Sequence, residues 1–205
     1  MMAGLALVPT VDEVRSLVRL QSVLSQHVRL APVLGHPANM PHLTLVQGEF
    51  GDRVNFELIL HTLREHHSAE RFDRLKYDSI VIKEPSWLFL LTSRIAGLRG
   101  LHDRAFELSK PHLKPPPLQE RKPDYSEPEW ARYVEWGYRY IGDSFLPHVT
   151  LGKMTSPREP LTGPILGNAF ADFVARGNTF TPAAITAYRA GEFGSYAETL
   201  AWLAL

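Results

Sequence analysis

The spacing of apolar and polar positions predicts alternating strands and helices in the first third of the chain. Leu5–Val8 form a short apolar run expected to be a strand. Apolar residues then recur at helical intervals from Val14 to Val28, after a Thr-x-x-Glu pattern at Thr10 that is typical of a helix start. A strand over Met40–Val46 and a helix over Phe56–Leu63 repeat this order.

The rest of the chain continues in the same mixed manner. The further expected elements are a hairpin of Leu75–Ile82 and Trp87–Leu91, a helix over Leu98–Leu108, a strand over Phe145–Lys153, a helix over Ile165–Phe173, and a closing hairpin of Ala184–Arg189 and Tyr196–Leu203. Because strands and helices mix without regular βαβ alternation, the pattern favours an α+β fold over a doubly wound parallel sheet.

One segment interrupts this order. Six prolines fall within Pro111–Pro128, which predicts a surface insertion at about residues 111–128 without a packed element. A short aromatic helix around Trp130–Trp136 follows it. Its aromatic side chains suit either stacking on a nucleic-acid base or packing in the core, because their three-residue spacing is also that of a buried helix face.

Composition narrows the classes of function. The 205 residues fit a single domain over 1–205, and 22 basic residues balance 22 acidic ones. Without a global positive field we expect any nucleic-acid contact to be local, to a nucleotide or an end. The chain has no cysteine, no apolar run near the roughly 20 residues that span a bilayer, and no basic, apolar leader, so a cytoplasmic protein without membrane contact is expected.

The most specific signal is a repeated five-residue word. Pro41–Leu45 reads Pro-His-Leu-Thr-Leu, and Pro147–Leu151 reads Pro-His-Val-Thr-Leu. The two histidines, His42 and His148, are 148 − 42 = 106 residues apart. A lone histidine is more often structural than catalytic, but the duplication of the whole word reverses that expectation.

Strand geometry assigns these side chains to faces. Alternate residues share a face, so His42 points with Thr44, and His148 with Thr150, while the intervening apolar residues point into the core. If the two strands lie side by side, two imidazoles and two hydroxyls surround a space of anion size. Imidazoles exchange protons near neutral pH and hydroxyls donate to phosphoryl oxygens, so this set suits a phosphodiester.

With these motifs the chain resembles the two-histidine phosphoesterases, and within them the bacterial 2′-5′ RNA ligase and cyclic phosphodiesterase branch. The resemblance implies a bilobal α+β fold, with two mostly antiparallel sheets flanking a central cleft and helices outside. It implies that His42 and His148 are the acid/base pair and that Thr44 and Thr150 bind phosphate. It implies no metal and no cofactor.

Members of this family often carry Arg five residues after the second histidine, where this chain has Lys153; the first motif has Gln47 at that offset. Lys153 is expected either to contact the phosphate as a point charge or to be a solvated surface lysine. An offset of five has the wrong parity for the face of His148 unless the strand bulges or ends.

The implied function is hydrolysis of a 2′,3′-cyclic or 2′-5′-linked phosphodiester in a small nucleotide or at an RNA end, by a monomer without an obligate protein partner. Ligation of a 2′-5′ bond is the same chemistry reversed and stays open, as does the choice of base and acid. A nucleotide- or RNA-end-binding module with little turnover is the alternative from another class, and a ligand-free scaffold fits least well. His102 has no motif around it, and no chemical role is expected for it.

Overall fold

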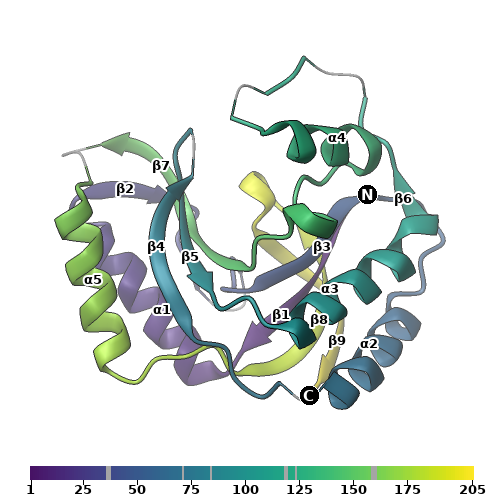
Figure 1. The fold of residues 1–205 in the computed structure, drawn as a ribbon, viewed down its shortest axis with the longest axis horizontal. Coiled ribbons are helices and arrows are strands. Elements are labelled where there is room, and N and C mark those ends of the chain that lie inside the picture. Colours follow the sequence, from purple (N-terminus) through teal and green to yellow (C-terminus); the bar gives the residue numbers. More distant parts are fainter. Residues whose placement is uncertain (36–37, 71, 84, 118–119, 123, 158–160) are drawn as a thin grey trace.

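The computed structural model describes residues 1–205 except 36–37, 71, 84, 118–119, 123 and 158–160. Over the described residues, five α-helices accompany one open sheet of nine strands, and every strand pairing is antiparallel (Figure 1). The expected α+β class is therefore confirmed.

The helices and strands follow the expected order. They are β1 (Met2–Pro9), α1 (Val11–Leu24), β2 (Val28–Ala31), β3 (Leu43–Phe50), α2 (Phe56–Glu70), β4 (Tyr77–Lys83), β5 (Trp87–Thr92), α3 (Ala96–Ser109), β6 (Leu113–Lys114), α4 (Glu127–Trp136), β7 (His148–Pro157), α5 (Gly163–Ala175), β8 (Pro182–Ala190) and β9 (Tyr196–Ala204). The backbone N–H of Thr10 donates to the Glu13 carboxylate 3.1 Å away, as the capping pattern predicts for the start of α1.

The strand order is β4-β5-β7-β3-β1-β8-β9, with β2 added to β7 and β6 added to β3. We call β1, β3, β6, β8 and β9 the first half-sheet, and β2, β4, β5 and β7 the second half-sheet. Among described residues, β3 and β7 join through one ladder pair, Leu43 with Val149. Where two separate sheets were expected, the strands thus form one hydrogen-bonded sheet with a narrow junction.

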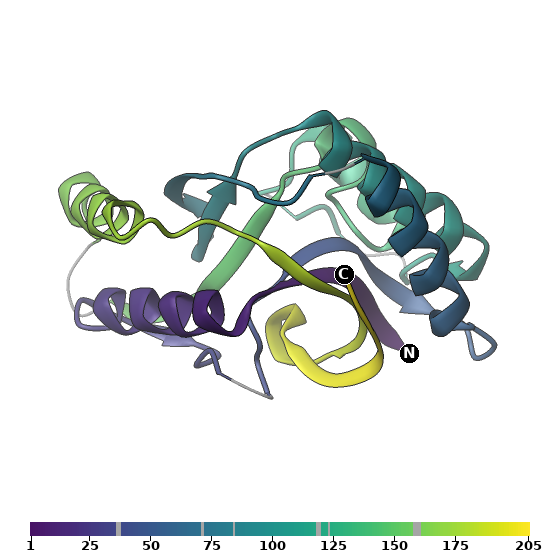
Figure 2. The ribbon, with the colours of Figure 1, turned by 90° about the horizontal axis from the view of Figure 1, so that it is seen from below.

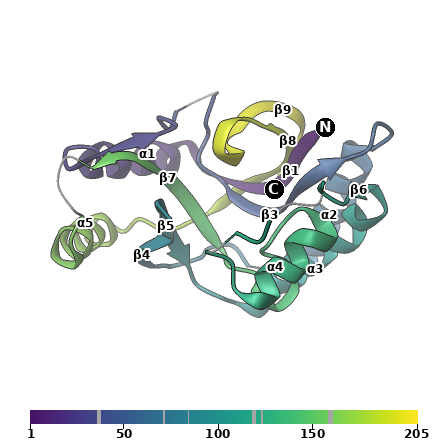
Figure 3. The same cartoon turned by 90° about the horizontal axis from the view of Figure 1, so that it is seen from above.

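The helices divide in the same way. Helices α2 and α3 pack against strands of the first half-sheet, whereas α1 and α5 pack together beside the second. Figures 2 and 3 show these two helix pairs at opposite ends of the molecule. Helix α4 lies beside α3 in Figure 3, where Trp136 packs on Phe106. Each half-sheet therefore has its own pair of covering helices.

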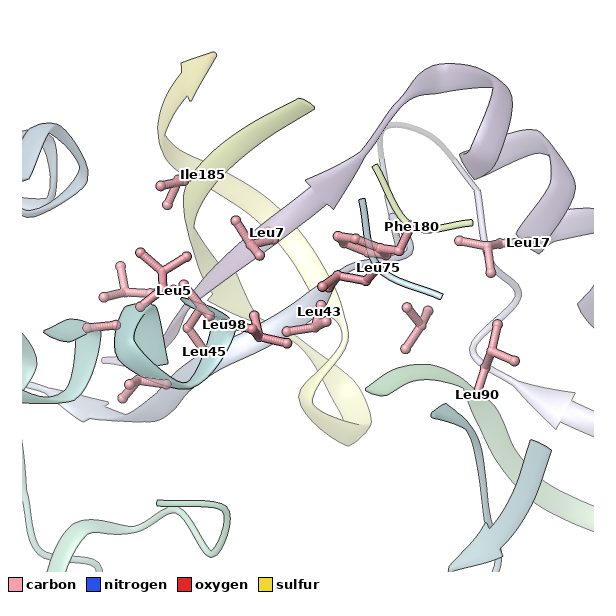
Figure 4. Close-up of a cluster of buried hydrophobic side chains, with 14 of the residues drawn as sticks. Leu5, Leu7, Leu17, Leu43, Leu45, Leu75, Leu90, Leu98, Phe180 and Ile185 are labelled. Atoms are coloured by element: carbon pink, nitrogen blue, oxygen red, sulfur yellow. The ribbon is translucent and has the colours of Figure 1, made fainter. Parts of the chain in front are cut away.

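One apolar cluster runs through both halves. It extends from Ile185 and Leu5 in the first half-sheet to Leu17 on α1 and Leu90 in the second (Figure 4). Leu43 lies between them with no exposed surface. Burial of this continuous cluster holds the junction of the half-sheets together, because removing apolar surface from water is the main stabilising contribution in folded proteins.

Three details differ from the pattern-based expectations. Val28 does not extend the first helix, which ends at Leu24, but begins β2. The described residues of the proline-rich insertion include the end of a 3-10 helix (Lys110–His112), the short strand β6, which pairs with the end of β3, and the start of α4. Residues 118–119 and 123 of the insertion, and Glu84 in the expected turn before Trp87, lie outside the described residues. No helix in the described part of the chain is long and apolar enough to cross a membrane.

Candidate active site

Both histidine motifs open onto one cavity of about 320 Å³. His42, Thr44, His148 and Thr150 all line it, while Leu43, Leu45, Val149 and Leu151 are completely buried on the other side of their strands. The structure thus brings together the four side chains that the repeated word singled out, with the predicted alternation of faces.

The Leu43–Val149 pair explains how the four side chains meet. Leu43 and Val149 are the middle residues of the two words, and they pair antiparallel. In this antiparallel register His42 and Thr150 follow the pair on one side, and Thr44 and His148 follow it on the other. Each histidine therefore leaves the junction on the same side as the threonine of the other motif.

The two imidazoles are held in the same way. Nδ1 of His42 lies 2.8 Å from the carbonyl oxygen of Met40, and Nδ1 of His148 lies 2.6 Å from that of Leu146. A carbonyl oxygen only accepts, so Nδ1 carries the proton in each ring. Nε2 is then the basic nitrogen of both neutral rings, and it has no hydrogen-bond partner among the described residues.

Aromatic side chains support both rings. His148 stacks on Phe89 with 3.8 Å between ring centroids, and His42 lies against Tyr188 at 4.7 Å. The hydroxyl of Tyr188 lies 3.5 Å from that of Thr44. Gly4 makes this packing possible, because a Cβ there would lie 2.6 Å from the Tyr188 ring.

Burial lowers the pKa of both histidines to about 4, although the hydrogen bond from Nδ1 opposes this shift in each case. His148 is 7% exposed, and the positive charges of His42 and Arg139 lower its pKa further. Both rings are consequently neutral at pH 7. A bound anion would raise both pKa values, because it stabilises the protonated form.

Each motif ends in a β-bulge. Leu45 is the extra residue of β3 against β1, where Ala6 pairs with Thr44 and Leu5 with Val46. Leu151 is likewise the extra residue of β7 against β5. A bulge reverses the alternation of faces beyond it. The position five residues after each histidine therefore turns to the histidine face.

This reversal decides where Gln47 and Lys153 lie. Gln47 lines the cavity. Lys153 does not line it, but its ammonium lies over the rings of Phe193 and Trp87, at 4.8 and 5.8 Å from their centroids. Both rings are cavity-lining residues. Lys153 thus lies at the rim of the cavity, and its contact with phosphate stays a prediction.

The second part of the insertion and the segment that follows it form a wall of the cavity, as their place just before the strand of His148 leads us to expect. Arg139 is 7% exposed, its guanidinium is 3.1 Å from Asp124, and it lies over the rings of Tyr125 and Tyr140. Lys122 lies over Tyr133 and Tyr125. The lining residues from this segment are Lys122, Tyr125, Tyr133, Gly137, Tyr138, Arg139 and Tyr140.

The side chains of the aromatic helix α4 divide between packing on other elements and lining the cavity. Tyr133 stacks on Trp130 and also lines the cavity, while Trp136 packs on Phe106 of α3. Tyr196, at the start of β9, is 1% exposed and also lines the cavity. The signal that could have indicated this wall is the run of tyrosines around Arg139.

The charged side chains that line the cavity are all cationic among the described residues. Of the described residues that line it, Lys122 and Arg139 are cationic and none is a carboxylate, in a protein whose formal net charge is zero. Such a lining favours an anionic ligand. No group of three or more His, Asp or Glu side chains in the described part of the chain has the arrangement of a metal site.

The hydrogen bonds of His102 differ from those of His42 and His148. Its Nδ1 also donates to a carbonyl, that of Leu45 at 2.7 Å, but its Nε2 accepts from the backbone N–H of Gly142 at 3.1 Å. The ring is fully buried and stacks on Phe145. Both nitrogens are engaged, so His102 has no free base, whereas His42 and His148 each keep one.

No family model and no curated protein matches the chain. Among solved structures, the fold is similar to the crystal structure of a conserved protein of unknown function from Agrobacterium tumefaciens strain C58. The two share 11% sequence identity with a TM-score of 0.52, over 99% of this chain and 84% of the other. At that identity the similarity concerns the fold alone.

Proposed function

We propose that this chain is a metal-independent phosphodiesterase of the two-histidine type, acting on a 2′,3′-cyclic or 2′-5′-linked phosphodiester of a nucleotide or an RNA end. The observation that carries the proposal is the matched state of His42 and His148. Each ring fixes its proton on Nδ1 and keeps Nε2 free beside one shared cavity. A structural histidine in the same protein, His102, lacks this free nitrogen.

The mechanism needs only groups that the cavity supplies. In hydrolysis, Nε2 of one neutral histidine takes a proton from water as the water oxygen bonds to phosphorus. The bond from phosphorus to the ribose oxygen breaks, and that oxygen receives the proton from Nε2 of the other, protonated histidine. Thr44 and Thr150 donate hydrogen bonds to the non-bridging oxygens, whose charge the cationic wall also favours.

Within this proposal the two half-sheets correspond to the two lobes of the two-histidine fold. Each half-sheet contributes one motif strand, β3 or β7, and each packs with its own helix pair. The narrow Leu43–Val149 junction is what a bilobal arrangement around a central site leads us to expect.

The test is turnover of a defined panel: the four 2′,3′-cyclic nucleotides, an RNA ending in a cyclic phosphate, and 2′-5′-linked dinucleotides. Release of a monophosphate product by the wild type, abolished in His42→Ala and His148→Ala, supports the proposal. His61→Ala is the matched control, because His61 is exposed on α2 away from the cavity. Saturable binding without product would instead assign a binding module, and joining of RNA ends would assign a ligase.

A further inference from the structure

Each of the two bulges leaves one residue without its ladder partner. A bulged residue drops out of the ladder, so its backbone groups need other partners. Leu45 and Leu151 are these residues, each three positions after its histidine. Both are buried, where an unsatisfied carbonyl would cost about 1–3 kcal/mol.

A buried helix side chain satisfies each carbonyl. Nε2 of Gln21, on α1, donates to the carbonyl of Leu151 at 2.7 Å. Nδ1 of His102, on α3, donates to the carbonyl of Leu45 at the same distance. Gln21 is 3% exposed and His102 is fully buried. The two half-sheets thus use different residues, from different helices, for the same contact.

Both side chains also reach a second part of the site. Gln21 donates to the carbonyl of Pro32 at 2.8 Å and accepts from the backbone N–H of Leu34 at 2.8 Å, and Pro32 and Leu34 line the cavity. His102 accepts from the N–H of Gly142, in the segment that leads to His148. Each side chain therefore ties a motif strand to a neighbouring wall or approach segment.

We propose, building on the proposed function, that Gln21 and His102 are positioning residues that hold the two histidine motifs in reactive geometry by capping the carbonyls of Leu151 and Leu45. Neither touches the substrate. Each fixes the strand at the bulge that turns the residue five positions after the histidine, Lys153 or Gln47, to the histidine face. Displacements near 1 Å at such supporting positions can cost about a hundredfold in rate.

The experiment compares substitutions that remove chosen hydrogen bonds of these two side chains. Gln21→Met keeps the length and loses all three bonds. His102→Asn keeps a donor at the position of Nδ1, whereas His102→Gln places its amide near Nε2 and loses the bond to Leu45. We expect kcat to fall about tenfold or more in Gln21→Met and in His102→Gln, with little change in KM. We expect His102→Asn to retain most of the wild-type kcat.

Ser109→Ala is the matched control on α3, because Ser109 is as buried as His102 but its hydroxyl has no hydrogen-bond partner among the described residues. A merely structural role would lower Tm and leave kcat per folded molecule unchanged in all variants. It would also give His102→Asn and His102→Gln the same kcat. Either result overturns the proposal.

A second readout does not depend on turnover. Imidazole nitrogen signals in NMR report the tautomer and surroundings of each histidine. Gln21→Met should shift the signals of His148 and leave those of His42 in place, and His102→Gln should shift both. If the wild type turns over no substrate in the panel, the proposed function fails while this measurement still decides the positioning role. Unchanged signals in folded variants would reject it.

Discussion

Leu43 and Val149, the middle residues of the two histidine motifs, pair directly across the junction of the half-sheets. This one contact relates the motifs by an approximate two-fold axis, so that His42 and His148 enter the cavity in equivalent ways. Their surroundings differ: Arg139 lowers the pKa of His148, whereas His42 lies against Tyr188 and Tyr196. The chemical roles therefore follow from the neighbours of the motifs.

Loss of either histidine should lower kcat/KM by about 10²- to 10⁴-fold on a 2′,3′-cyclic nucleotide, the usual contribution of general acid–base catalysis. Because the two rings act as one unit, His42→Ala/His148→Ala should fall little below the slower single variant. Thr44→Val and Thr150→Val should be milder, since each removes one hydrogen bond and no proton carrier. Near-wild-type rates in both single histidine variants would remove the catalytic assignment.

Desolvation is the main cause of the low pKa of both histidines, but only His148 also has the cationic Arg139 near it. We therefore expect His148 to be the general base and His42 the general acid. A phosphodiester of p-nitrophenol tests this, since p-nitrophenolate leaves without a proton. His42→Ala should recover most of its rate on this ester and His148→Ala should not. The reverse pattern would exchange the two roles.

The pH dependence should differ between kcat/KM and kcat. The profile of kcat/KM reports the free enzyme, in which both pKa values are about 4. The productive state has one neutral and one protonated ring, so the kcat/KM maximum should lie on the acid side of neutrality. In the complex the phosphate anion raises the pKa of the acid, so the alkaline limb of kcat should move to higher pH. Coincident profiles would contradict this coupling.

Activity should survive an excess of EDTA. The cavity offers two imidazoles but no carboxylate or thiolate among its described lining residues, and divalent metals in catalytic sites usually have three protein ligands. The measurement is the rate before and after chelation and dialysis. A lost rate that Zn²⁺ or Mn²⁺ restores would show that the reaction uses a metal.

The largely buried pair of Arg139 and Asp124 should stabilise this wall of the cavity. Arg139→Met leaves the half-buried Asp124 carboxylate without its partner, so the free energy of unfolding should fall by about 1–3 kcal/mol. The exposed Arg15–Asp12 pair gives the control, because Arg15→Met should cost less than about 1 kcal/mol. Urea denaturation of both variants measures the difference, and equal losses would contradict the role of burial.

Much of the site could be predicted because local rules determine it. Strand alternation placed His42 with Thr44 and the intervening leucines in the core, and the repeated word located both strands. Loop and wall residues could not be predicted in this way. Arg139 lines the cavity because of its pair with Asp124 and its tyrosine neighbours, and no periodic pattern encodes such contacts.

The end of the first helix is a second feature that the sequence pattern did not predict correctly. Val28 continues the helical spacing of α1, yet it is buried in β2, which pairs with β7. Non-local strand pairing thus overrides a local pattern at this position. The bulges at Leu45 and Leu151 belong to the same class, because side chains from distant helices, Gln21 and His102, bind their carbonyls.

The extra residue in each motif strand shifts the alternation of faces by one position. If Leu45 took a regular place in the ladder with β1, every later side chain of β3 would turn over. Val46, now without exposed surface, would face the cavity, and Gln47 would enter the core. The same change at Leu151 would turn Lys153 away from Trp87. Deleting Leu45 or Leu151 would, by contrast, remove the bulge and leave the later side chains on their present faces.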